Sequence, residues 1–203
     1  MVAANKGAPS RKNFADAFRG FKALSDKHPD ARLYVHSEAT GRFGGEDLPK
    51  LLTACGIDPD LVYWPDQYRA VHLPWPGEHM AKVFSAFDVL LSPSAGEGFG
   101  IPVIEAQACG TPVIVSDFSA QPELVGSGWL IEGDTTWTPI GSWQFDPSVG
   151  DLIDALLRAY NARGSEVHRQ KARKHALAYD IQHVVAEYML PALAECEKRF
   201  EAR

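Results

Sequence analysis

The stretch from Ser92 to Ser116 constrains the fold of this chain most strongly. It reads S-P-S-A-G-E-G-F-G-I-P-V-I-E-A-Q-A-C-G-T-P-V-I-V-S, with apolar runs at 87–91 and 112–115. Short apolar runs bounded by turn residues are typical of buried strands, and a proline in a first turn with a glycine after the last turn frames a helix. The stretch therefore predicts a strand, a glycine-rich loop, a helix and a second strand, as in an α/β protein.

The glycine-rich loop at 96–100 leads into the N-terminus of the predicted helix. Such an end carries unpaired N–H groups and the positive pole of the helix dipole, and glycines let a ligand approach the backbone. Glu97 lies in the loop, and Glu105 lies in the first turns of the helix with its side chain leaning back towards the same end. Carboxylates accept hydrogen bonds from paired hydroxyls. The pattern indicates a ligand with a diphosphate, a sugar and a ribose, which is a nucleotide sugar.

The run Glu97 to Glu105, E-G-F-G-I-P-V-I-E, resembles the E-x7-E motif of the retaining GT-B glycosyltransferases, in particular family 4, the glycosyl transferases group 1. The alternative is that Glu97 and Glu105 are surface glutamates at a helix and have no role in binding. The resemblance implies the C-terminal, donor-binding domain of such an enzyme. It implies an α/β fold with a Rossmann-like, doubly wound, parallel six-stranded sheet that forms one half of a GT-B fold.

The rest of the chain continues the alternation of strands and helices. Apolar patterns predict strands at 1–5, 32–36, 61–64, 88–92, 112–115 and 129–132, in the order 3-2-1-4-5-6. They predict further helices at 13–28, 47–55, 77–87, 149–160, 165–178 and 181–200, and Pro191 should break or bend the last one. We expect the segment 133–147 to be a packed surface loop; a lid is the alternative.

Basic residues follow the first predicted strand, where open α/β sheets bind their ligands. They are Lys6, Arg11 and Lys12. The resemblance implies that Lys6 and Lys12 contact the donor diphosphate, with Arg11 as a substitute for Lys6, whose position is more often arginine in the family. A solvated basic loop is the alternative.

The resemblance also assigns roles to single residues. Glu97 positions the donor sugar and Lys12 stabilises the departing diphosphate, so these two are the catalytic candidates. Glu105 holds the ribose. Further donor-binding candidates are the loop residues Ser94, Gly98, Phe99 and Gly100, and Asp66 and Gln67, at which the backbone meets the nucleotide base. The sequence has no D-x-D motif and no metal-ligand spacing, so we expect a metal-free site without a cofactor and a nucleotide sugar as substrate.

Composition limits the classes of function. A net charge of −6 argues against non-specific nucleic-acid binding. The three cysteines follow no disulfide or metal pattern and no signal peptide is visible, which predicts a cytoplasmic protein, or one at the inner face of a membrane in its full-length form. We expect residues 1–203 to be a single donor domain without the N-terminal acceptor domain, inactive in transfer by itself. Apolar residues facing the missing domain, among them Tyr188, Met189 and Leu193, would be exposed or paired in a weak homo-oligomer.

Two other functions compete with sugar transfer. A stand-alone nucleotide or nucleotide-sugar binding module with a regulatory role would bind tightly without an upstream domain. A phosphorylase or a non-hydrolysing epimerase would share the fold, but the sequence shows neither a cofactor-bearing lysine nor the acidic and histidine signatures of those enzymes. The nucleotide base, the sugar, the acceptor and the linkage stay open.

Overall fold

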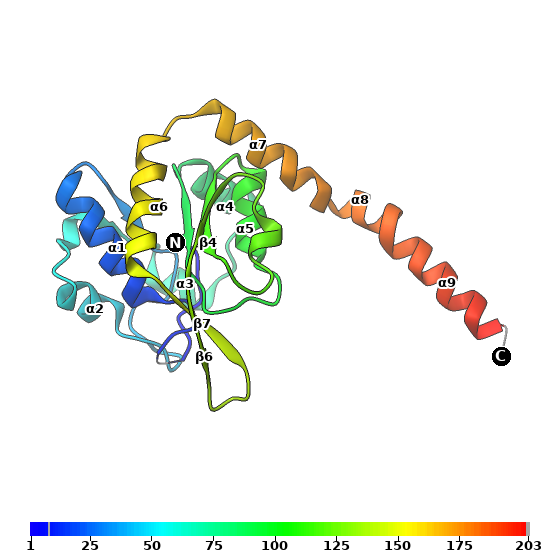
Figure 1. The fold of residues 1–203 in the computed structure, drawn as a ribbon, viewed down its shortest axis with the longest axis horizontal. Helices are drawn as coiled ribbons and strands as arrows, with labels where there is room; N and C mark the ends of the chain where they lie inside the picture. Colours follow the sequence, from blue (N-terminus) through cyan, green and yellow to red (C-terminus); the bar gives the residue numbers. More distant parts are fainter. Residues whose placement is uncertain (8, 202–203) are drawn as a thin grey trace.

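The structure, a computed structural model, describes residues 1–7 and 9–201. Its centre consists of parallel strands flanked by helices (Figure 1). Strands β1 (Leu33–Tyr34) and β2 (Val62–Tyr63) pair in parallel, and β3 (Leu90–Ser92), β4 (Val113–Ser116) and β5 (Gly128–Ile131) form a second parallel sheet in that order. The predicted parallel α/β fold is confirmed.

The first predicted strand, at 1–5, forms only an isolated parallel bridge, between Val2 and His36. It lies beside β1, so the order 3-2-1 is correct within the first group of strands and 4-5-6 within the second. The predicted count of six strands in one sheet is not confirmed, because no strand pairing joins the first group to the second within the described part of the chain.

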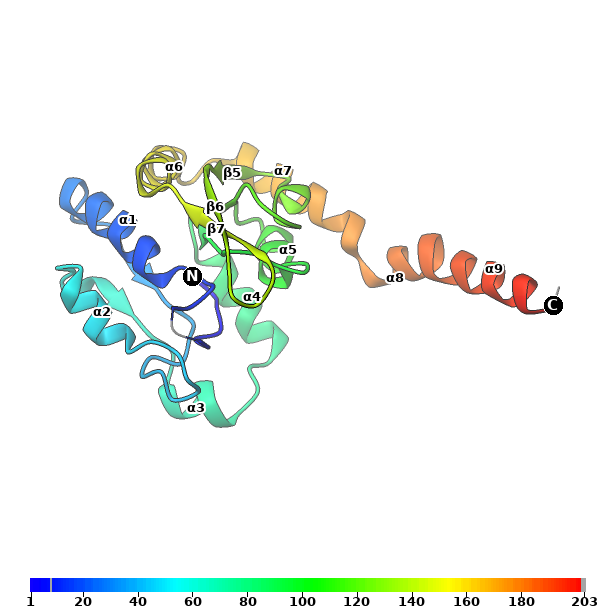
Figure 2. The ribbon, with the colours of Figure 1, turned by 60° about the horizontal axis from the view of Figure 1, so that its bottom comes forward.

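Helices cover the strands on both sides (Figures 1 and 2). The α-helices are α1 (Phe14–Lys27), α2 (Leu48–Ala54), α3 (Gln67–His72), α4 (Gly77–Ser85), α5 (Ile101–Ala108), α6 (Val149–Asn161), α7 (Glu166–Ala176), α8 (Ile181–Val184) and α9 (Leu190–Glu201). Short 3₁₀ turns lie at Pro59–Leu61, Pro122–Leu124 and Leu177–Tyr179, and a π-helical turn at Val185–Met189.

Apolar spacing and capping residues explain the main helices. Phe14, Phe18 and Phe21 recur on one side of α1 and are buried in the core. Asp47 caps α2 and Ser148 caps α6 through their side chains. One apolar cluster fills the space between α1, α6 and the strands, and a second lies around α4 and α5.

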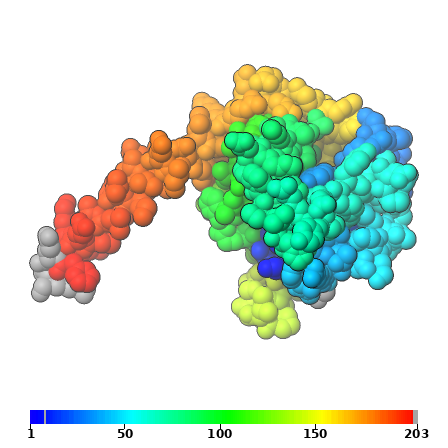
Figure 3. All heavy atoms as spheres, turned by 180° about the vertical axis from the view of Figure 1, so that it is seen from behind, coloured from blue at the N-terminus to red at the C-terminus, as the bar shows by residue number. Residues whose placement is uncertain are grey.

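Two segments differ from the predictions. Residues 67–72, for which the sequence predicted no helix or strand, form α3, which Asp66 caps. The segment 133–147 is not a loop: β6 (Gly133–Trp137) and β7 (Trp143–Pro147) form an antiparallel hairpin that projects from the body (Figure 3). Only its base packs against the body, where Phe145 is buried and stacks on Phe118. Threonine and tryptophan favour strands, and Gly141, at a φ of 76°, closes the turn between them.

The C-terminal segment leaves the body as an arm (Figures 1 and 2). Helix α7 still packs against α5, whereas α8, the π-helical turn and α9 point away. Pro191 lies in the first turn of α9, where a helix tolerates it, and the π-helical turn precedes it. Tyr188, Met189 and Leu193 are exposed, as expected. Among the described residues, no helix combines the length and the apolar character that a membrane crossing requires.

Candidate functional site

Two loops that are distant in sequence are joined by hydrogen bonds at the carboxyl end of the strands. The backbone N–H of Ala95 donates to the carbonyl of Arg11 at 2.7 Å, and the Ser94 hydroxyl donates to the same oxygen at 3.0 Å. The Asn13 side-chain amide donates to the carbonyl of Pro93 at 2.7 Å. These bonds hold the basic loop against the glycine-rich loop.

Glu97 pairs with both cations of the basic loop. One carboxylate oxygen lies 3.0 Å from the Arg11 guanidinium, and the other accepts a hydrogen bond from the Lys12 ammonium. The side chains of Glu97 and Lys12 are only 10% and 16% exposed, so water screens their pair weakly. Burial by itself raises the pKa of Glu97, but the hydrogen bond and charge of Lys12 and hydrogen bonds from Arg11 and Ser94 outweigh it and lower the pKa below its ordinary value.

The glycines between Glu97 and α5 leave this end of the helix open. Gly100, in the left-handed region at a φ of 106°, turns the chain into α5. A Cβ at Gly98 would meet no atom within 4 Å, and Phe99 beside it is exposed. The start of α5, with Lys12 and Arg11 opposite it, is therefore suited to an anionic ligand.

Glu105 lies on α5 and is exposed at the surface. Partial burial of its carboxyl raises its pKa. It has no ion pair within residues 1–7 and 9–201, so its oxygens are available to hydroxyl donors.

The other predicted residues lie apart from the Glu97 cluster. Lys6 is exposed on its loop and makes no ion pair with any described residue. Asp66 caps α3 by accepting the N–H of Arg69 at 2.7 Å. The Gln67 amide accepts from the N–H of Ala39 at 2.9 Å and donates to carbonyl oxygens of its surroundings. Both side chains are thus used by the fold, and a base contact there remains a prediction for the backbone.

Two residues that the sequence did not single out shape the site. Asn13 and Ser119 have φ angles of 52° and 54°, and no other non-glycine residue of the described chain has a positive φ. The Ser119 hydroxyl accepts the N–H of Glu97 at 2.9 Å, and Asn13 holds Pro93. Asparagine is the residue type that more often adopts a positive φ angle. The identity of Asn13 was therefore the only sequence signal for either residue.

A pocket of about 320 Å³ lies beside the basic loop, between the start of α1 and the hairpin. Arg11, Asp16, Glu46 and Asp146 supply its charged lining. Burial raises the pKa of Asp16 and of Glu46. The pocket thus holds three carboxyl groups beside the Arg11 guanidinium, whereas the start of α5 faces two cations.

Comparison with known proteins gives a consistent result. The family model described as glycosyl transferases group 1 matches residues 2–160. A D-inositol 3-phosphate glycosyltransferase of Mycobacterium sp. (strain KMS) is 30% identical over 158 residues, which are 75% of this chain and 31% of that protein. The corresponding protein of Segniliparus rotundus is 35% identical over 142 residues, or 67% of this chain and 28% of that protein. The chain thus spans about a third of the length of these relatives.

Solved structures have the same fold. A sucrose-phosphate synthase from Thermosynechococcus elongatus superposes with a TM-score of 0.66 at 21% identity, covering 95% of this chain and 43% of that one. The C-terminal domain of a glycosyl transferase group 1 family protein from Francisella tularensis gives a TM-score of 0.59 at 18% identity, covering 92% and 84%.

Proposed function

Because the chain belongs to the glycosyl transferases group 1 family, we propose that it binds the nucleoside-diphosphate sugar donor of a retaining sugar transfer, which the full-length protein carries out. Its fold is that of a GT-B glycosyltransferase domain. The observation that carries the proposal is the pairing of Glu97 with Lys12 and Arg11 beside the open start of α5.

The cluster is suited to a diphosphate that bears a sugar. Lys12, Arg11 and the N-terminal end of α5 supply positive charge where the bond between the anomeric carbon and the diphosphate breaks, and fixed charges of this kind stabilise a developing anion. When a diphosphate takes the two cations, the Glu97 carboxylate is free to accept hydrogen bonds from the sugar hydroxyls. Glu105 accepts from the ribose hydroxyls. The transferred sugar ends on an acceptor hydroxyl, with the same anomeric configuration.

The basic groups make a metal ion unnecessary in this scheme, and it requires no cofactor. The acceptor would be bound by a domain outside this chain, because the curated relatives are about three times as long as the matched region. We place the protein in the cytoplasm and, in its full-length form, at the inner face of a membrane. The exposed apolar residues of the arm are the candidate contacts to the acceptor domain or to a second copy.

Calorimetric titration tests donor binding directly. UDP, GDP and ADP are titrated as bare diphosphates and as their glucose conjugates, first with a chelator and then with magnesium. We expect one base to be preferred and binding to be independent of the metal. Absence of binding at millimolar concentration of every ligand, also after an upstream domain is restored, would refute the proposal.

Two substitutions separate the roles of the glutamates. We expect Glu97→Ala to weaken binding of the nucleotide sugar and to spare the bare diphosphate, whereas Glu105→Ala weakens both. Glu187→Ala, on the exposed arm, is the matched control and leaves both unchanged. Equal losses for both ligands in the two variants would contradict this assignment.

A further inference from the structure

The hairpin of β6 and β7 is anchored at the candidate site. The N–H of Phe145 in β7 donates to the carbonyl of Ala95 at 2.9 Å, two residues before Glu97. The buried Phe145 ring stacks on Phe118, with the ring centroids 5.7 Å apart. Phe118 lies against Gly96, where a Cβ would be 3.7 Å from its ring. The base of the hairpin is therefore fixed to the loop that carries Glu97.

The two faces of the hairpin differ in chemistry. The cross-strand register pairs Trp137 with Trp143. One step nearer the base, it pairs Thr135 with Phe145. Because side chains alternate along a strand, these four side chains share one face, the aromatic face. The opposite face lines the pocket of about 320 Å³ with the polar side chains of Thr136, Thr138, Gln144 and Asp146.

The two tryptophans form an exposed pair on the aromatic face. Their ring centroids are 5.4 Å apart, the rings are inclined by 69°, and Trp137 and Trp143 are 58% and 57% exposed. The turn beyond them is closed by Thr138, whose N–H and hydroxyl both donate to the carbonyl of Ser142, at 3.0 and 2.8 Å. The pair is thus held in a defined geometry, about 7 Å farther along the strand than Phe145.

An indole ring suits the C–H face of a sugar ring. Its π face is negative and attracts the slightly positive C–H groups, and its N–H can donate a hydrogen bond at the edge. The hydroxyls of a pyranose point outward around the ring, so the ring keeps an apolar face for stacking. Thr135, exposed in the same row, adds a hydroxyl that can donate and accept. The aromatic face is therefore suited to a saccharide.

Charge and area disfavour other occupants of the aromatic face. Residues 133–147 include Asp134 and Asp146 and contain no lysine or arginine, so an anionic membrane surface or a nucleic acid would be repelled. Two tryptophans bury at most about 250 Å² each, whereas a stable protein interface buries about 800 Å² on each partner. The exposed pair is too small for such an interface.

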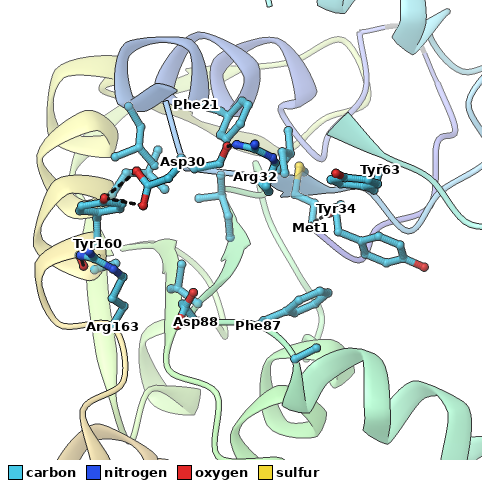
Figure 4. A pocket seen from close by; sticks show the side chains of 18 of the residues that line it. Met1, Phe21, Asp30, Arg32, Tyr34, Tyr63, Phe87, Asp88, Tyr160 and Arg163 are labelled. Carbon is cyan, nitrogen blue, oxygen red and sulfur yellow. Dashed lines mark hydrogen bonds between the residues drawn. The ribbon is translucent and has the colours of Figure 1, made fainter. Parts of the chain in front are cut away.

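A larger cavity, of about 580 Å³, lies between β1 and β3 (Figure 4). Helices α1 and α6 also line it, with Tyr160, whose hydroxyl donates to Asp30 at 2.8 Å. Its lining includes no described residue of the hairpin or of the Glu97 cluster. A ligand in that cavity would therefore lie apart from a donor held at Glu97.

We propose that the aromatic face of the hairpin binds the acceptor of the transfer, a neutral saccharide, with one sugar ring stacked on Trp137 and Trp143. This inference rests on the proposed function, because the donor at Glu97 is what makes a ligand on this face an acceptor. The aromatic row leads from the tryptophans through Phe145 to the glycine-rich loop, so a saccharide that follows it presents its other end to the donor sugar. The hairpin adds this contact to those of the domain outside this chain.

Titration of the isotope-labelled chain with neutral saccharides tests the proposal. The probes are cellotetraose, mannotetraose and galactotetraose, and sorbitol is the control because it has hydroxyls but no ring. NMR signals of the indole N–H groups of Trp137 and Trp143 report binding, and Trp129, which packs against the core, reports non-specific effects. Trp137→Ala removes half of the pair. Ile140→Ala, exposed in the turn, is the matched control variant.

We expect at least one tetrasaccharide to shift the signals of Trp137 and Trp143 at millimolar concentration and to leave Trp129 unchanged. Trp137→Ala should weaken this binding at least fivefold, and Ile140→Ala less than twofold. The proposal would be overturned by no shift with any tetrasaccharide or by an equal shift with sorbitol. It would also be overturned if a higher protein concentration alone shifted both signals, because a second copy would then cover the tryptophans.

The diphosphate titrations, repeated with the same variants, separate this inference from the proposed function. We expect Trp137→Ala to bind the preferred diphosphate as the unsubstituted chain does. Diphosphate binding without saccharide binding would overturn this inference alone. Saccharide binding without any diphosphate binding would contradict the proposed function, and the hairpin would then not be an acceptor site.

Discussion

Lys12 and Glu97 lie 85 residues apart in the sequence and form a shielded ion pair where the basic loop meets the glycine-rich loop. Arg11 completes the cluster by bonding to Glu97 and to the carbonyl of Gly96. The pair therefore links the two halves of the domain at the candidate site.

Substitution of Glu97 should lower the stability of the protein. Because the folded state holds the pKa of Glu97 below its ordinary value, this carboxylate stabilises the fold above pH about 4.5 and loses its effect as the pH falls through the folded-state pKa. We expect Glu97→Gln to cost roughly 1–3 kcal/mol at pH 7 and less near pH 3, measured by urea unfolding. Glu195→Gln, which breaks an exposed pair with Arg199, should cost under about 1 kcal/mol; an equal cost for both variants would count against a shielded pair.

Glu105 should behave in the opposite way. Its pKa is raised by burial, so its ionised form is disfavoured by folding, and stability falls as the pH rises through the window above the ordinary value. Glu105→Gln is therefore expected to raise the melting temperature at pH 7 and to leave it unchanged at pH 4. Glu187→Gln, on the exposed arm, should change neither value. A lower melting temperature of Glu105→Gln at pH 7 would show that Glu105 has a stabilising partner.

The buried amine of Met1 gives the stability a pH dependence. Its pKa falls from 8.0 to about 5 on folding, so between these values the unfolded chain binds a proton that the folded chain does not. Stability should rise with pH across this window, by up to about 4 kcal/mol for the full shift. His36 faces this amine; its pKa is lowered by burial, by His79 and by the amine, so it adds to the same slope. Acetylation of Met1 keeps the N–H and removes the charge, and should flatten the slope; identical slopes with and without acetylation would contradict burial of the amine.

Two helical glycines should respond to alanine with opposite signs. A Cβ at Gly20 of α1 would come within 1.9 Å of Leu152 of α6, whereas the nearest atom at Gly150 is 3.7 Å away. Gly20→Ala should destabilise the fold by about 1–3 kcal/mol through overpacking. Gly150→Ala should stabilise it by about 0.5–1 kcal/mol, because alanine favours the helix. Chemical denaturation of both variants measures the difference, and a stabilised Gly20→Ala would mean that α1 and α6 pack less closely.

Local signals were sufficient to predict most of the fold. Helices α1, α2 and α6 have apolar periodicity and clear ends, and were predicted within a few residues. Helix α3 has no buried residue, so it left no periodic pattern. The hairpin was missed because its strands are largely exposed, with Trp137 and Trp143 facing solvent, and lack the alternation of a half-buried strand.

The charged residues of the candidate site could be predicted from the sequence, because binding an anionic ligand requires particular residue types. Glu97, Lys12 and Arg11 carry charges in motifs, and the structure brings them together. Ser119 contributes to the site through its positive φ angle and through the hydrogen bond that its hydroxyl accepts from the N–H of Glu97. Neither feature can be predicted from the spacing of residues in the sequence.

The projecting arm has a consequence for measurements in solution. A helix that extends from a globular body increases hydrodynamic drag while it adds little mass. The 22.3 kDa chain should therefore sediment slowly and elute early from a sizing column, as a larger compact particle would. Its elution volume by itself would suggest a dimer, so the molar mass has to be measured by light scattering, which does not depend on shape.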